Sequence, residues 1–405
     1  MTEVRLRPAE AVLAGHPDKL ADAVADALVG EATSRNRMSL VGVEVAVHRE
    51  SVFLTGRIAG PDDLTEDDVA DVVREVYAAT GYGEEWGPTP AALRIVTDLA
   101  LGPLQDGEAE IRSISADQAI SIGYAVDRPA TDHLPPEHWL ARRIARELAA
   151  LRSGVPGLHL GPDGKVALLC AEPADGGPIR IDAITVSLQQ RTDASVVATR
   201  RAVLAAIRSA MRAAPEAFHA PRDLADRLVF NGAGDFDRGG PHGDNGLSGK
   251  KLVVDAYGPR VPIGGGALSG KDFFKVDRAG AIAARRLALG AIRDGLGAEV
   301  TAELLWRPGD AEARIAALVD GDGRSITPGP SSEAVDLSLE YSGHVWPAEL
   351  WVAEGGSGTL RARFSRLAAE GHFGTGRPWE RDHEQADDGG SSGQPNWGWC
   401  GTGRF

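Results

Sequence analysis

The residues best suited to chemistry lie in one glycine-rich stretch, residues 239–278. From residue 244 to 278 it carries six bases and four acids: Lys250, Lys251, Arg260, Lys271, Lys275, Arg278, Asp244, Asp255, Asp272 and Asp277. Closely spaced glycines let backbone N–H groups approach an anion, lysines neutralise phosphate oxygens, and carboxylates hold the divalent cation that bridges them. The pattern therefore predicts a site for a polyphosphate.

Two other kinds of anion site fit this stretch poorly. The formal net charge of the chain is -15, so a local cationic pocket suits a small polyanion better than nucleic acid, which needs a broad basic surface. Residues 265–271 match the P-loop pattern GxxxxGK, but Asp272 follows the lysine. A P-loop has Ser or Thr at that place, because its hydroxyl binds magnesium. No nucleic-acid partner is expected, and a true P-loop is disfavoured.

A second group of functional side chains lies near the N-terminus, in the pentapeptide Gly-His-Pro-Asp-Lys at residues 15–19. Apolar residues recur at helical spacing after it, which predicts an amphipathic helix over residues 19–33. Asp18 alone would be enough to cap that helix. An imidazole, a carboxylate and an amine beside a rigid proline indicate a further role, in which His16, Asp18 and Lys19 bind a substrate.

Taken together, the two segments resemble the S-adenosylmethionine synthetase (methionine adenosyltransferase) family. The resemblance rests on GHPDK with the ADxxxDA helix after it, and on GGPxGDxGLxGKK, VDxYG, GGGAxSGKDxxKVDR and AARRLA further along the chain. Smaller matches follow in family order, such as PDGK at 162–165 and GHFG at 371–374. The resemblance covers roughly residues 3–384 and identifies a divergent member of the family.

The resemblance implies a reaction and a role for each candidate residue. Methionine sulfur would attack C5′ of ATP, and the released triphosphate would then be cleaved to pyrophosphate and phosphate. Catalysis at the triphosphate would fall to His16, Lys165, Lys271 and Lys275. The ATP and amino-acid pockets would include Lys19, Asp117, Asp163, Phe236, Asp244, Lys250 and Lys251. Two Mg²⁺ ions would be bound by Asp18 and Asp277, and K⁺ by Glu44. Active sites between two subunits imply a homodimer or a dimer of dimers.

The chain departs from the family pattern mainly on the amino-acid side. Ala14 stands where the pattern has Glu before GHPDK, and Arg57 where it has a glutamate near the methionine amino group. A guanidinium in place of a carboxylate reverses the charge offered to the substrate. We therefore expect Arg57 either to lie in the amino-acid pocket and alter substrate choice, or to turn to solvent or pair with Glu50. The segment 101–115, which corresponds to a mobile gate, aligns poorly, and Gln105 offers its one possible substrate contact.

Composition limits the remaining possibilities. The 405 residues include two cysteines, Cys170 and Cys400, so neither a disulfide framework nor a four-cysteine zinc site is expected. No apolar run approaches membrane-spanning length and no signal-like segment opens the chain, which predicts a cytoplasmic protein without a membrane partner. Residues 385–405 read as a flexible tail.

Helical patterns alternate with paired strand-like runs three times along the chain. The runs at 41–47 with 51–59, 165–171 with 179–188, and 300–306 with 313–320 predict antiparallel hairpins. Helices are expected at 65–80, 136–152, 195–213, 275–294, 331–340 and 358–370, and a further strand at 251–257. This is an α+β pattern, and the resemblance implies three similar βαβ-containing domains in a pseudo-threefold arrangement. We expect an N-terminal domain at 1–110, a central domain at 111–231 and a C-terminal domain at 232–384.

Three functions remain open from the sequence. The first is an adenosyltransferase that makes S-adenosylmethionine, or a close sulfonium analogue from another thioether. The second is a catalytically weak homologue that serves as a regulatory subunit, and the third is a tripolyphosphate hydrolase that has lost amino-acid use.

Overall fold

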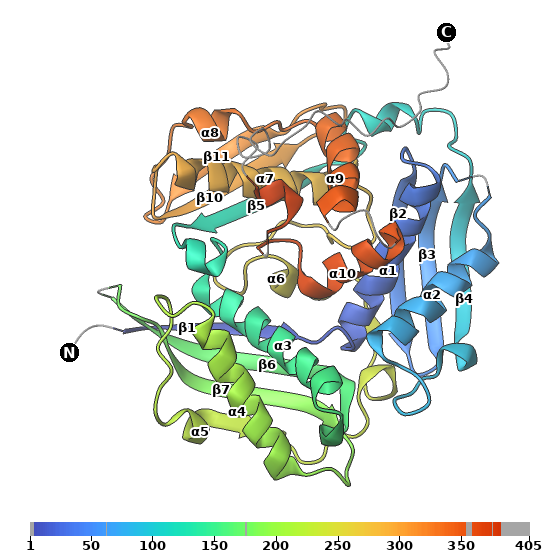
Figure 1. The fold of residues 1–405 in the computed structure, drawn as a ribbon. Helices are drawn as coiled ribbons and strands as arrows, with labels where there is room; N and C mark the ends of the chain where they lie inside the picture. Colours follow the sequence, from blue (N-terminus) through green and yellow to red (C-terminus); the bar gives the residue numbers. More distant parts are fainter. Residues whose placement is uncertain (1–3, 62, 175, 354–358, 375, 382–405) are drawn as a thin grey trace.

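The computed structural model describes residues 4–61, 63–174, 176–353, 359–374 and 376–381 (Figure 1). The tail predicted at residues 385–405 lies outside the described residues. Within them the chain forms three sheets with helices packed against them. This confirms the predicted α+β class.

Each predicted hairpin is present and forms the centre of one sheet. β2 (Leu40–His48) pairs with β3 (Ser51–Ala59), β6 (Leu160–Pro173) with β7 (Arg180–Gln190), and β10 (Glu299–Trp306) with β11 (Arg314–Asp320), all antiparallel. The sheets have the strand orders β4-β3-β2-β9, β1-β6-β7-β8 and β11-β10-β5. Three sheets of this kind agree with a chain of three similar domains.

Strands from distant parts of the chain complete these sheets. β1 (Val4–Val12) pairs with β6, β5 (Ala119–Val126) with β10, and the short β9 (Gly246–Leu247) with β2. β4 (Arg94–Gly102) and β8 (Leu228–Phe230) add parallel edge strands. Because the sheets exchange strands across residues 110 and 232, those domain boundaries stay predictions.

Two local predictions were wrong. Residues 251–257 do not form a strand but contain the short helix α6 (Leu252–Asp255). The helix predicted at 331–340 is divided into α8 (Pro330–Glu333) and α9 (Leu339–Ala353). An apolar run of four to eight residues, such as that within 251–257, cannot be assigned to strand or helix by its periodicity alone, and tertiary packing decided this case.

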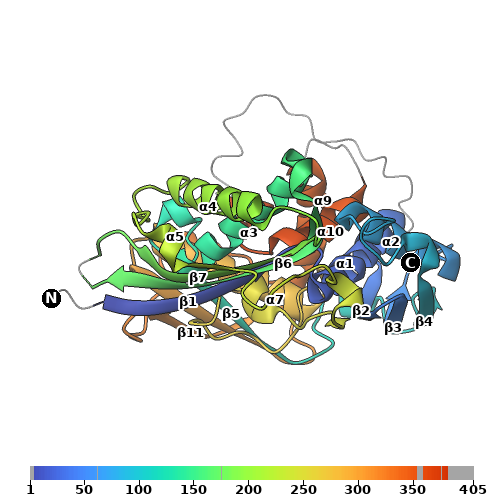
Figure 2. The same ribbon diagram turned by 90° about the horizontal axis from the view of Figure 1, so that it is seen from below.

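Most helices lie on one side of the molecule and the strands on the other (Figure 2). The helical side includes α2 (Glu66–Thr80), α3 (Pro136–Gly154), α4 (Val196–Arg212) and α10 (Leu360–Glu370). α7 (Val276–Arg293) packs against β5 and β10, and α5 (Leu224–Arg227) leads into β8. Large apolar side chains remain exposed on the strands: Leu6, Phe53, Val96, Ile120, Leu305 and Ile315.

The helix α1 (Pro17–Arg35) is almost completely buried and packs along α10. Gly30 is a position of close approach, because a Cβ atom there would lie 2.8 Å from the backbone of Arg361 in α10. Glycine costs roughly 1 kcal/mol relative to alanine inside a helix. The close contact between the two helices explains why the glycine is nevertheless suitable here.

We predict that Gly30→Ala destabilises the protein, although alanine has the better helix propensity. The new methyl group must displace the α10 backbone, and overpacking of this kind costs about 1–3 kcal/mol. Urea unfolding followed by circular dichroism measures the change. Gly154→Ala at the end of α3 is the matched control, because no atom lies within 4 Å of its new methyl group, and it should change stability by less than about 1 kcal/mol. A stabilised Gly30→Ala variant would contradict this account of the packing.

Candidate active site

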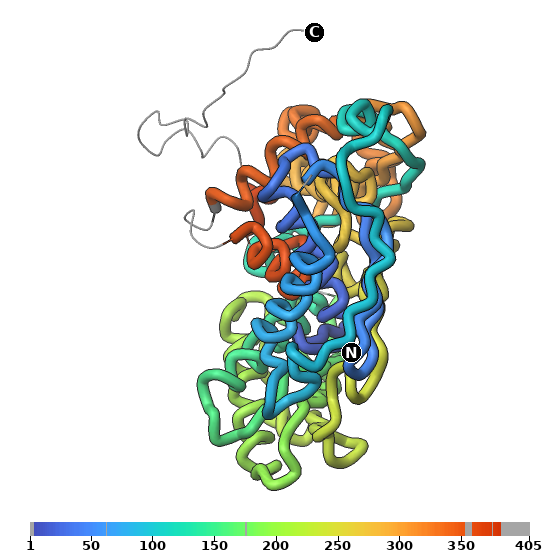
Figure 3. Tube along the Cα trace, turned by 90° about the vertical axis from the view of Figure 1, so that its right-hand side faces the viewer, coloured from blue at the N-terminus to red at the C-terminus, as the bar shows by residue number. Residues whose placement is uncertain are grey.

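Three carboxylates on one face of α1 hold the glycine-rich stretch in place. Asp18, Asp22 and Asp26 are four residues apart, so they lie one above another on the helix. They accept hydrogen bonds of 3.0, 2.8 and 2.9 Å from the backbone N–H groups of Leu247, Gly249 and Gly270. We call these three residues the aspartate row. Figure 3 shows the glycine-rich stretch, in yellow, beside the blue trace of the N-terminal part.

A cation compensates each buried carboxylate of the aspartate row. Lys251 Nζ lies 2.5 Å from Asp18 and Lys19 Nζ 3.0 Å from Asp22, while Arg278 forms a buried ion pair with Asp26. Burial would raise the pKa of Asp26, but the charge of Arg278 acts together with His372 and the Gly270 N–H to lower it. At Asp22 burial prevails over Lys19 and raises the pKa to about 7. The aspartate row therefore fixes the glycine-rich stretch to α1 and also holds Lys19 and Lys251 in place.

Asp18 is the centre of a first cluster of predicted site residues. Lys250 Nζ lies 3.6 Å from its carboxylate, in addition to Lys251. Burial would raise the pKa of Asp18, but the hydrogen bonds from Lys251 and from the Leu247 N–H lower it. The carboxylate is therefore ionised at neutral pH although it is only 2% exposed.

His16 caps α1 beside Asp18. Its Nδ1 accepts a 3.3 Å hydrogen bond from the Asp18 backbone N–H. Burial and the neighbouring Lys251 lower the pKa of His16 to about 4. The imidazole is therefore neutral at pH 7, with its proton on Nε2 and available as a hydrogen-bond donor.

The strand β6 brings Asp163 and Lys165 to this cluster. Gly15 packs so closely on β6 that a Cβ atom would lie 2.4 Å from the carbonyl oxygen of Pro162. Asp163 accepts a 2.7 Å hydrogen bond from the N–H of Gly240, and burial raises its pKa to about 6. Lys165 Nζ lies 2.7 Å from Glu10 on β1. The first cluster comprises His16, Asp18, Asp163, Lys165, Lys250 and Lys251.

A second cluster lies at the start of α7. Lys271 forms an ion pair with Asp277, and a Cβ atom on Gly266 would collide with that carboxylate. The Lys275 ammonium has no ion pair or hydrogen bond within the described part of the chain, and it lies near Gly42 of β2. Asp277 stands in the first helical turn, where the helix dipole favours a carboxylate.

The two clusters lie along β2 at different positions. Lys271 pairs with Gly42 of β2, while Leu247, which donates to Asp18, pairs with Ala46. Four residues of a strand span about 13 Å. Glu44 lies between these two points and accepts a hydrogen bond from the hydroxyl of Ser248. The segments that carry the two clusters therefore meet β2 about 13 Å apart.

Arg57 does not pair with Glu50, which was one arrangement expected from the sequence; its place in the amino-acid pocket stays a prediction. Its guanidinium forms two hydrogen bonds with the Glu108 carboxylate, of 2.6 and 2.8 Å, and one of 2.9 Å with the Pro103 carbonyl oxygen. Glu50 pairs instead with His242, at 2.9 Å. The carboxylate of Glu108 therefore neutralises the guanidinium within the segment predicted as a gate, and lies beside the place of the missing family glutamate.

Three predicted site residues lie outside these contacts. Asp244 is exposed, but its charge acts on His16 and Asp163, so it borders the first cluster. Phe236 is half-buried, and its carbonyl oxygen accepts from the Gln190 N–H at 2.8 Å. Asp117 is exposed and bonds only to its neighbours within the described residues.

Several residues that support the site received no individual role from the sequence, namely Asp22, Asp26, Glu108, Asp255 and Arg278. The four-residue spacing of the three aspartates on a predicted helix was a usable signal for the row. No local pattern could have joined Arg57 to Glu108, because the two lie 51 residues apart in the chain.

Family models and relatives agree with this arrangement. The N-terminal, central and C-terminal domain models of S-adenosylmethionine synthetase match residues 5–100, 113–236 and 238–381. S-adenosylmethionine synthases of Methylorubrum populi and Mycobacterium marinum are each 32% identical, over 92% and 93% of this chain and 95% and 96% of their own. One from Nitratiruptor sp. is 33% identical over 94% of this chain and 96% of its own.

A solved structure shares the fold. It is an unusual S-adenosylmethionine synthetase from Campylobacter jejuni, with a TM-score of 0.77, 24% identity, and coverage of 93% of this chain and 97% of that one. The fold and the site together define a three-domain α+β protein with a lysine- and carboxylate-rich site. The protein belongs to the S-adenosylmethionine synthetase family, which confirms the family prediction.

We predict that Asp26→Ala lowers the free energy of unfolding by about 3–5 kcal/mol, because it leaves the buried charge of Arg278 without its partner. Urea denaturation measures the loss. Asp182→Ala is the control: Asp182 forms an exposed 3.2 Å ion pair with Arg227, and such pairs contribute at most about 1 kcal/mol. Equal effects of the two substitutions would contradict a structural role for the aspartate row.

Proposed function

We propose that the protein is a methionine adenosyltransferase, which forms S-adenosylmethionine from ATP and methionine and releases pyrophosphate and phosphate. The main observation that supports this proposal is the aspartate row, because it brings Asp18, Lys250 and Lys251 together beside His16. The names of the relatives support this activity over a regulatory subunit or a hydrolase.

The transfer of the adenosyl group to sulfur requires no general base. A thioether sulfur is a neutral nucleophile with no proton to remove, so the rate depends on alignment with C5′ and on stabilisation of the leaving triphosphate. The five lysines Lys165, Lys250, Lys251, Lys271 and Lys275 would supply the positive charge. His16 Nε2 would donate a hydrogen bond to the oxygen that gains charge, since Nδ1 is already occupied.

Other predicted residues would form the adenosine and amino-acid pockets. Phe236 would stack on adenine from its half-buried position, while Asp163, Asp244 and Asp117 would bind polar groups of the substrates. Lys19 would act through Asp22 and Asp255, with which it forms buried ion pairs of 3.0 and 2.5 Å. It therefore positions α1 in our account and does not contact phosphate.

The donor set fits magnesium. Asp18 and Asp277 offer hard carboxylate oxygens. Within the described residues no group of three or more His, Cys, Asp or Glu side chains could hold a metal ion, so phosphate oxygens of ATP and water would complete the coordination of the two proposed Mg²⁺ ions. This is the usual manner of magnesium binding in nucleotide enzymes. When bound, Mg²⁺ would neutralise charge on the triphosphate. K⁺ would bind at Glu44, whose carboxylate lies beside the Ser248 hydroxyl.

We infer a site shared between two copies of the chain. The two clusters are about 13 Å apart along β2, and a carboxylate in each is occupied by a lysine of its own chain. If the first cluster of one copy faces the second cluster of its partner, both can contact one triphosphate. Exposed apolar residues on the sheet, Phe53 and Val96 at 43% and 44% exposure, support a homodimer, alone or as a dimer of dimers.

Methionine is the substrate we propose. The Arg57 guanidinium is engaged by Glu108, so an α-ammonium group would meet a neutralised pair and not an isolated positive charge. Arg57 therefore borders the amino-acid pocket in this proposal, with Glu108 as the nearest acid. No helix among the described residues could span a membrane, and a cytoplasmic location stays a prediction.

We predict that Lys271→Ala and Asp18→Ala each reduce S-adenosylmethionine formation about 100- to 1,000-fold, as the loss of a transition-state contact does. The product is measured by mass, and phosphate is measured with and without methionine. Arg201→Ala, on the exposed face of α4, is the control and should keep full activity. Full turnover in either active-site variant would refute the assignment. Phosphate release independent of methionine would favour the hydrolase, and no product from the purified chain would favour the regulatory subunit.

We predict that the protein is at least a homodimer and that Phe53→Glu makes it monomeric, because a charge would be buried in an apolar interface. Light scattering should report at least twice the 42.5 kDa of the chain for the native protein. Val197→Glu on α4, where the native side chain is 72% exposed, is the control and should leave the mass unchanged. A native monomer at micromolar concentration would contradict the shared site.

A further inference from the structure

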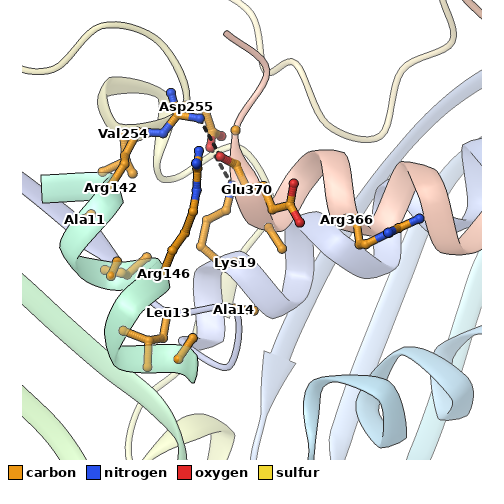
Figure 4. Close-up of a pocket in the computed structure, with 15 residues that line it drawn as sticks. Ala11, Leu13, Ala14, Lys19, Arg142, Arg146, Val254, Asp255, Arg366 and Glu370 are labelled. Atoms are coloured by element: carbon orange, nitrogen blue, oxygen red, sulfur yellow. Dashed lines mark hydrogen bonds and ion pairs between the residues drawn. The ribbon is translucent and has the colours of Figure 1, made fainter. Parts of the chain in front are cut away.

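A cavity of about 460 Å³ lies behind the GHPDK turn (Figure 4). It is bounded by the end of β1, the start of α1, α3, α6 and the C-terminal part of α10. Asp18 and Lys19 are adjacent in the chain, but their side chains lie in different sites. Asp18 belongs to the first cluster, and Lys19 lines this cavity. The cavity is therefore distinct from the proposed triphosphate site.

Positive charge prevails among the groups that line the cavity. Figure 4 shows Arg142 and Arg146 from α3 and Lys19 from α1 around the same space, with Arg366 further along α10. The acids are Asp255 and Glu370. Asp255 is engaged by Lys19 at 2.5 Å, and Glu370 is 3.3 Å from Arg377. Lys19 and Asp255 thus compensate each other, and three arginines share the cavity with Glu370.

Neither Arg142 nor Arg146 of α3 forms an ion pair with a carboxylate among the described residues, although the charge of Glu370 acts on Arg146. Arg142 is buried, with only 6% of its surface exposed. Its guanidinium donates hydrogen bonds to the carbonyl oxygens of Phe373 and Glu370. Burial and the adjacent Arg146 lower the pKa of Arg142 to about 9. No hydrogen bond or ion pair reaches the Arg146 guanidinium from the described residues. A buried cation without an acid is costly unless an anion binds beside it.

The rest of the lining is apolar. It comes from small and aliphatic side chains, namely Ala11, Val12, Leu13, Ala14, Ala145 and Val254. Pockets of this size with an apolar wall and a few charged groups are typical of sites for small organic ligands. The apolar wall would cover a hydrocarbon body, and the arginines would bind an anionic head by charge-assisted hydrogen bonds.

We propose that this cavity binds a small organic anion, with its carboxylate or phosphate head at Arg146 and Arg142 and its apolar body against the Ala11–Ala14 wall. The site is a second ligand site, and it does not depend on the activity proposed above. A bound anion would lie next to the Lys19–Asp255 ion pair, one residue from Asp18.

Calorimetric titration of the full chain tests the proposal with three matched probes. The first, 4-phenylbutyrate, has both an apolar body and a carboxylate. Its amide, 4-phenylbutanamide, has the body without the charge, and acetate has the charge without the body. We expect 4-phenylbutyrate to bind with one site per chain, and each of the other two at least about tenfold more weakly, since both features contribute.

Two variants locate the binding. Arg146→Gln removes the head-group contact and keeps a polar side chain, and Ala14→Glu places a carboxylate in the cavity. Each should weaken 4-phenylbutyrate binding about tenfold or more. Circular dichroism verifies folding, and Arg201→Ala is the matched control with unchanged affinity. Equal binding of the amide, equal binding of acetate, absence of binding, or full affinity in both variants would each overturn the proposal.

Discussion

The arrangement of the candidate site depends on the burial of three carboxylates on one helix. A buried carboxylate needs hydrogen bonds and a cation, and the aspartate row obtains both from the glycine-rich stretch. Leu247, Gly249 and Gly270 supply backbone N–H groups, while Lys251 and Arg278 supply charge. The same contacts that satisfy the row also set the positions of the lysines that would bind a triphosphate.

The constraint also explains why one chain presents its functional groups in two clusters. The row extends along α1, so the segments bonded to its two ends are kept apart, near Ala46 and near Gly42 of β2. In the shared site that we propose, the two clusters that contact one triphosphate come from different chains. The open strand side of the molecule, with its exposed Phe53, supports an assembly of this kind.

The ion pair of Arg57 and Glu108 shows that the effect of a substituted residue depends on the group that it contacts. The change from a carboxylate to a guanidinium reverses the charge at one position, and the sequence alone left open whether the substrate is altered or the residue is peripheral. Two hydrogen bonds to Glu108 restore neutrality. The bidentate geometry, which suits arginine and carboxylate, also attaches residues 103–108 to β3.

Local patterns determined much of this protein. Paired strand-like runs predicted the three hairpins, helical spacing predicted α1 and α7, and the motifs predicted the family and the residues of both clusters, because these depend on neighbours in the chain. Tertiary structure alone decided the exchange of β1, β5 and β9 between sheets, the helix at 252–255, the partner of Arg57 and the cavity beside Arg146. Each of these depends on contacts between residues far apart in sequence, and no local periodicity encodes which distant group will satisfy a buried charge or an unpaired strand.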